Sequence, residues 1–120
     1  MKNQEYQVLL RKSRNAPLEA ITLTGDLLDE AKKLINSSYA TTIPIREDIL
    51  VIIDEEIMMK ENYENKTNFW YDSISKNGEM VKLKFPQWIY GDIVFVGFKN
   101  NDLTSLSQEQ EEFINNYLFE

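Results

Sequence analysis

The final third of the chain carries the pattern that most constrains the fold. Residues 92–98 are strongly apolar, as expected for a buried strand. After a polar turn, Ser107 precedes Gln110 by three residues, the spacing of a capping box at a helix start. Apolar side chains then recur at helical spacing, at Phe113, Ile114, Tyr117 and Leu118. This order predicts a helix that folds back over a sheet.

The first part of the chain predicts a strand pair and a helix. Residues 5–12 and 18–24 alternate in polarity, and the turn between them contains Asn15 and Pro17, so a hairpin is expected. Residues 27–35 place apolar side chains on one face of a 3.6-residue period. Thr24 or Asp26 is the expected cap of this helix, because both side chains accept backbone hydrogen bonds.

The middle of the chain predicts further strands. Residues 39–46 read as extended, and Pro44 predicts an edge or a strand end because proline has no N–H. Residues 48–54 contain five consecutive β-branched or leucine residues, which predicts a central strand. Residues 55–66 are expected to form a loop or a short irregular helix. An Asn-Gly pair predicts a hairpin turn at 77–78, followed by a strand at 80–85 that Pro86 ends.

These elements predict the order β-β-α-β-β-loop-β-β-α. The fold class is therefore expected to be α+β, with a mostly antiparallel sheet of about five to six strands and two main helices packed on it. With 120 residues, a single domain over 1–120 is the default interpretation.

Composition excludes several kinds of chemistry. The chain has no cysteine and no histidine, so disulfides, Cys/His zinc sites and histidine-dependent nucleophilic catalysis are excluded within it. We expect no cofactor, no metal and no enzymatic activity. The net charge is −7, from 20 acidic and 13 basic side chains, which argues against direct nucleic-acid binding. The first fourteen residues differ, since Lys2, Arg11, Lys12 and Arg14 face only Glu5.

The expected location is the cytoplasm of a bacterial cell. The first residues, Met-Lys-Asn-Gln-Glu, lack the apolar segment of a signal peptide. The longest apolar run, residues 49–53, falls far short of the ~20 residues that span a bilayer. No membrane association is therefore expected.

Three features resemble a small domain family of unknown function that bacteriophages and bacterial mobile elements encode. They are a strand pair followed by a leucine-rich helix, an apolar strand ending in an acidic run at 54–56, and a segment over 89–118. That last segment contains Ile-x-Gly, an apolar strand, Ser-Leu-Ser and an acidic helix, and it carries the most specific part of the match. The resemblance implies a phage or prophage origin. It implies no activity, because the family has no established catalytic residues.

Two groups of acidic residues are candidate binding sites. Asp54, Glu55 and Glu56 end the most apolar strand, where carboxylates could hold a divalent cation or transfer protons; a solvated turn is the alternative. Glu109 and Glu112 lie in the final helix, near Glu120 at its end, where they could imitate the charges of nucleic acid. Helix capping and solubility are the alternative explanation.

Trp70 and Trp88 are the aromatic candidates. Tryptophan is enriched at interface hot spots, so these side chains could form a binding surface; a place in the core is the alternative. The leading hypothesis is a non-catalytic macromolecule-binding module with a protein partner. An acidic inhibitor of a host nucleic-acid or defence enzyme is one alternative, and a small-ligand binder or accessory enzyme that uses carboxylates is another. The sequence does not predict the oligomeric state.

Overall fold

The computed structural model describes residues 4–119, which form eight strands and two α-helices. Lys2 and Glu120 lie outside the described residues. The strands are β1 (Glu5–Arg11), β2 (Glu19–Thr24), β3 (Ala40–Arg46), β4 (Ile49–Asp54), β5 (Thr67–Lys76), β6 (Glu79–Tyr90), β7 (Ile93–Lys99) and β8 (Asp102–Thr104). The helices are α1 (Leu27–Leu34) and α2 (Gln108–Phe119), with short 3-10 turns at Ile57–Met59 and Tyr63–Lys66. The predicted α+β class and the two main helices are confirmed.

All eight strands belong to one mixed sheet. The order is β2-β1-β7-β4-β3-β5-β6, and β8 pairs with β7. Every pairing is antiparallel except that of β3 with β5, which is parallel and joins Arg46 to Ser75. The predicted five to six strands were too few, because β5 and β8 were not recognised. The aromatic residues of β5 had been interpreted as a cluster, and the residues of β8 as a polar turn.

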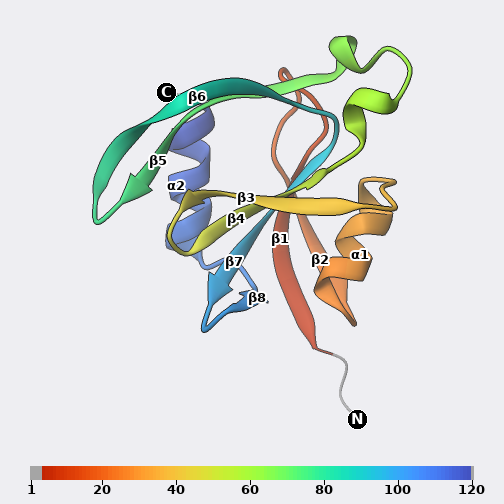
Figure 1. Cartoon of the computed structure of the whole chain (residues 1–120). Coiled ribbons are helices and arrows are strands. Elements are labelled where there is room, and N and C mark those ends of the chain that lie inside the picture. The colour runs from red at the N-terminus through yellow and green to blue at the C-terminus, as the bar shows by residue number, and fades with distance from the viewer. Residues whose placement is uncertain (1–3, 120) are drawn as a thin grey trace.

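The two helices cover opposite faces of the central strands (Figure 1). On β7, Val94 and Val96 pack in the cluster that contains α1 residues, whereas Ile93 and Phe95 pack in the cluster that contains Ile114 of α2. Successive side chains of a strand point to opposite faces, so a strand covered on both sides needs apolar residues at every position. This explains the continuous apolar runs of β4 and β7 and confirms the central place of β4.

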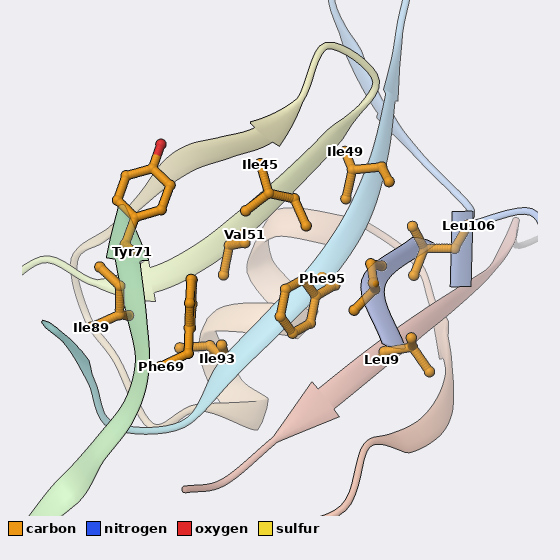
Figure 2. Close-up of a cluster of buried hydrophobic side chains, with 11 residues drawn as sticks. Leu9, Ile45, Ile49, Val51, Phe69, Tyr71, Ile89, Ile93, Phe95 and Leu106 are labelled. Atoms are coloured by element: carbon orange, nitrogen blue, oxygen red, sulfur yellow. The ribbon is translucent and has the colours of Figure 1, made fainter. Parts of the chain in front are cut away.

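The larger cluster lies on the α2 side and draws on β1, β3, β4, β5, β6 and β7, as Figure 2 shows. The β5–β6 hairpin curves over α2, and the C-terminal end of that helix lies beside it (Figure 1). Tyr117 of α2 packs edge-on against Phe69 of β5, with ring centroids 6.1 Å apart, and its hydroxyl donates to the Ser73 carbonyl at 2.7 Å. These contacts hold the end of α2 against β5.

The predicted caps and turns are confirmed. Asp26 caps α1 by accepting a hydrogen bond from the Asp29 N–H at 2.9 Å. At the start of α2, the Ser107 N–H donates to Gln110 Oε1 at 2.8 Å and the Gln110 N–H donates to Ser107 Oγ at 3.2 Å. Asn77 and Gly78 adopt φ angles of 52° and 81°, as a tight hairpin turn requires.

The predictions for the two prolines have different outcomes. The sequence predicts Pro44 at an edge or a strand end; β3 is not an edge strand, but Pro44 is the third residue from its end, where the register with β4 shifts. The Pro44 carbonyl accepts a hydrogen bond from the Tyr71 hydroxyl at 2.6 Å. Pro86 does not end β6, which continues to Tyr90. Because β6 is the edge strand, it tolerates the missing N–H, and its register against β5 shifts at this point.

Candidate functional site

A cleft of about 450 Å³ lies where the end of β1, the following turn, β5, β6 and the end of α2 meet. We name it the tryptophan–arginine cleft. Its lining residues are Arg11, Arg14, Asn15, Asn68, Phe69, Trp70, Trp88, Leu118 and Phe119. The cleft therefore combines two cations with four aromatic rings, supplied by segments far apart in the sequence.

The two tryptophans face each other across neighbouring strands. Trp70 of β5 pairs with Trp88 of β6 in register, and their rings make an edge-on contact with centroids 5.3 Å apart. Trp70 is 45% exposed, although a tryptophan in a core would be largely covered. The Arg14 guanidinium lies over the Trp88 ring, 5.1 Å from its centroid, in cation–π geometry. The structure thus brings together both predicted aromatic candidates, together with a cation.

Arg11 is buried in the cleft, with 3% of its surface exposed. Its Nε donates to the Ala16 carbonyl at 3.3 Å, its Nη1 to the Asn68 carbonyl at 3.3 Å, and its Nη2 to the Arg14 carbonyl. The Phe119 ring lies over its guanidinium at 4.8 Å. Burial lowers the pKa of Arg11, because a charged group is less stable away from water.

Neither cleft arginine has a carboxylate partner among residues 4–119, where the ion pairs involve Lys33, Arg46, Lys60 and Lys82. Carbonyl dipoles and aromatic rings are therefore the groups that stabilise these two charges within the described residues. In a chain of net charge −7, this makes the cleft a local concentration of positive charge.

Asn68 fixes the base of the cleft. It is fully buried, and its Nδ2 donates to the Arg11 carbonyl at 2.9 Å and to the Gly91 carbonyl at 2.8 Å. Its Oδ1 accepts no hydrogen bond from any described residue. The β5–β6 register shifts at this position, between Thr67 and Phe69, which turns the amide inward to join β5 to the end of β1.

The acidic run after β4 is partly structural. Burial acts to raise the pKa of Asp54, but the Lys60 ammonium at 2.8 Å, the Glu56 N–H and the Ser37 hydroxyl outweigh it, so the pKa is lowered. Asp54 is thus a buried carboxylate that holds the loop after β4 in place. Glu55 is exposed and Glu56 is half-buried, and Glu55 shares a hollow with Asp54 and Trp88.

The acidic helix is also tied to the sheet. Glu109 forms an ion pair with Arg46 of β3, and hydrogen bonds from that guanidinium lower the pKa of Glu109. Arg46 contacts Asp48 as well, at 2.6 Å, and Gln110 donates to the Asp48 carboxylate at 3.0 Å. Glu112 is exposed and lines a separate hollow with Leu18 and Ala20, away from the contact between Glu109 and Arg46. The acids of α2 therefore do not converge with those of β4.

Within residues 4–119, no group of three or more acidic side chains is placed to hold a metal ion. The sequence reasoning identified Trp70 and Trp88 but missed Arg11, Arg14 and Asn68. The basic bias of the first fourteen residues was the available signal, since it includes both arginines. The sequence did not show that this segment meets β6, because the contact depends on tertiary structure.

The described residues contain no helix long and apolar enough to cross a membrane. Comparison of the chain with protein-family models, curated proteins and solved structures finds no match. The resemblance to the bacteriophage family therefore stays a prediction. The fold and the cleft define the chain as an α+β protein with an exposed aromatic and cationic site.

Proposed function

We propose that the protein is a non-catalytic binding module that holds a protein partner against the tryptophan–arginine cleft. The observation that carries this proposal is the half-exposed Trp70, paired with Trp88 under the Arg14 guanidinium. Tryptophan and arginine are the residues most enriched at interface hot spots, because they combine a large apolar area with directed polar contacts.

The aromatic surface continues beyond the cleft. Trp70 also lines a neighbouring hollow of about 220 Å³ with Met80, Phe113 and Tyr117. Met80 is 54% exposed, and Phe119 at the other end of the cleft is 52% exposed. An apolar surface that extends over two adjoining hollows supports the binding of a folded partner or a peptide segment rather than a single small group.

The acidic side chains support the two alternatives less well. An acidic inhibitor would need free carboxylates in an extended array, yet Glu109 and Asp48 share Arg46 and Asp54 holds Lys60. A carboxylate enzyme would need acids that converge with raised pKa values, and the pKa of Asp54 is lowered. The charged residues are better explained as contacts between elements.

We further propose that the protein acts in the bacterial cytoplasm and derives from a bacteriophage or a related mobile element. The support for this origin is the sequence pattern over residues 89–118, together with the acidic run after β4. Expression of the gene during phage induction, followed by fractionation of the cells, tests both statements.

Site-directed photo-crosslinking tests the binding function. Asn15→p-benzoylphenylalanine places a crosslinker on the cleft, and Asp102→p-benzoylphenylalanine places one on β8 as the matched control. We expect a discrete crosslinked protein from host lysate at position 15 alone, and we expect Trp70→Ala to abolish it. The proposal fails if the product is absent, if it appears equally at position 102, or if it survives Trp70→Ala.

A further inference from the structure

Among residues 4–119, the charge of the cleft is unbalanced. Arg11 and Arg14 line one cleft, and no carboxylate of residues 4–119 pairs with either. Like charges in one partly desolvated site repel each other, and burial adds a further cost for Arg11. An anion beside the two guanidinium groups offsets their mutual repulsion, so the site favours a negatively charged ligand.

The arginines retain hydrogen-bonding capacity for such a ligand. Arg11 is buried and gives three of its five N–H donors to carbonyl oxygens, so its charge is the main contribution to a ligand, and Arg14 is the accessible donor. Arg14 is exposed, with its guanidinium over the Trp88 ring, so its N–H groups are accessible to a ligand that enters the cleft. Carboxylates accept hydrogen bonds from two guanidinium N–H groups at once, which makes them a suitable ligand for these donors.

The walls of the cleft favour an apolar group beside the anion. Trp70, Trp88 and Phe119 contribute three rings, and the Phe119 ring already lies over the Arg11 guanidinium at 4.8 Å. A phenylalanine or leucine side chain of a partner would bury apolar area against Trp70, which favours binding. The site therefore combines anion recognition with an apolar anchor.

We infer that the tryptophan–arginine cleft recognises an acidic peptide segment of the partner, in which carboxylates flank an apolar side chain. The carboxylates contact the exposed Arg14 and are attracted by the buried charge of Arg11, and the apolar side chain packs on Trp70. This inference rests on the proposed function, and it names the chemistry of the partner. The volume of about 450 Å³ lies within the range of ordinary ligand pockets, so the segment that enters is short.

A peptide fits better than a nucleic acid, which could also supply anions and flat groups. A single strand carries a phosphate at every nucleotide and would extend past the cleft over an acidic protein of net charge −7. In the neighbouring hollow such a strand would meet the carboxylate of Asp72. A short acidic peptide places its charges within the cleft alone and avoids this repulsion.

Tryptophan fluorescence tests the inference directly, because the two tryptophans of the chain both line the cleft. The full chain is titrated with acetyl-Glu-Phe-Glu-amide and, as the matched probe, with acetyl-Gln-Phe-Gln-amide. We expect the acidic peptide to change the emission and to bind at least about tenfold more tightly, since hydrogen bonds to charged groups contribute about 1.5–3 kcal/mol. The advantage should shrink as salt rises.

Two substitutions that remove one positive charge each provide the control. Arg14→Gln should weaken the acidic peptide by about tenfold or more. Lys99→Gln, on the exposed end of β7, should leave the affinity unchanged. Equal effects of the two substitutions, or equal affinities for the two peptides, would overturn the inference.

Two further outcomes separate this inference from the proposed function. If hexauridine binds more tightly than the acidic peptide and its binding depends on Arg14, the inference of an acidic peptide ligand is overturned in favour of a nucleic acid. Failure of both peptides, while the position-15 crosslink to a partner persists, would overturn the acidic-segment inference and leave the binding function standing. Loss of the crosslink as well would overturn both.

Discussion

The Arg46 guanidinium donates two hydrogen bonds to the Glu109 carboxylate, Nη1 to Oε2 and Nη2 to Oε1, each 2.7 Å long. The same guanidinium also donates to both oxygens of Asp48, at 2.6 and 3.0 Å. This pair joins the first turn of α2 to the end of β3. A carboxylate that reads as a surface charge in the sequence is thus a contact between a helix and the sheet.

We predict that Arg46→Leu lowers the free energy of unfolding by about 1–3 kcal/mol. The substitution leaves Asp48 and Glu109 without their cation, and the Arg46 side chain is only 16% exposed. Urea denaturation measures the change. Lys99→Leu, at an exposed position, should alter the free energy by no more than about 0.5 kcal/mol. An equal loss in both variants would show that the ion pairs contribute nothing.

The same contacts predict how stability depends on pH. Hydrogen bonds from Arg46 lower the pKa of Asp48 in the folded state. A carboxyl group with a lowered pKa contributes stability above its unfolded pKa, about 4, and this stability is lost as the pH falls through the folded value. We therefore expect the melting temperature to fall as the pH drops below about 4. Asp48→Asn should show a shallower fall. If the melting temperatures of the wild type and of Asp48→Asn fall equally with pH, Asp48 is not the group responsible.

Gly97 is predicted to resist substitution. A Cβ at this position would lie 2.5 Å from the Ser105 carbonyl oxygen and 2.6 Å from Thr104 Oγ1. Gly97→Ala should therefore cost about 1–3 kcal/mol, as overpacking does in other cores. Adding Thr104→Ala removes the hydroxyl but leaves the backbone oxygen, so the double variant should recover only part of the loss. Chemical denaturation of the three proteins measures this, and full recovery would place the clash on Thr104 alone.

Asn68 is predicted to support the cleft. Asn68→Ala leaves the Arg11 and Gly91 carbonyls without their buried donor, which should cost about 2–4 kcal/mol for two hydrogen bonds. Asn115→Ala, on the exposed side of α2, is the control and should be close to neutral. Urea denaturation, monitored by tryptophan emission, compares the free energies of unfolding of the two variants. A neutral Asn68→Ala would mean that water replaces the amide.

Local sequence patterns predicted the helix caps and the hairpin turn, because these depend on residues close together in the sequence. Ser107 and Gln110 lie three residues apart and bond each other's backbone, and Asn77 and Gly78 are residue types that readily adopt the positive φ angles of a tight hairpin turn. β5 was harder to recognise, because its bulge at Asn68 interrupts the alternation of buried and exposed residues that defines a strand. The interior position of β3 followed from its pairing with a strand far along the chain, which no local pattern contains.

The candidate site divides in the same way. Trp70 and Trp88 could be selected because tryptophan occurs only twice in the chain and is enriched at interface hot spots. Arg11 and Arg14 could not be assigned to the same site as the tryptophans, because the end of β1 approaches β6 only in the folded sheet. Asp54 and Glu109 were selected as candidate binding residues for their charge, and their ion-pair partners Lys60 and Arg46 are seen only in the structure.

The most direct test of the central claim, that a protein partner binds at the tryptophan–arginine cleft, is fluorine NMR of the full chain labelled with 5-fluorotryptophan. The chain has two tryptophans, so the spectrum should contain two resonances, which Trp70→Phe assigns. On titration with the partner captured at position 15, we predict that both resonances shift and that Arg14→Gln weakens the effect. Binding of that partner with both resonances unchanged would contradict the account.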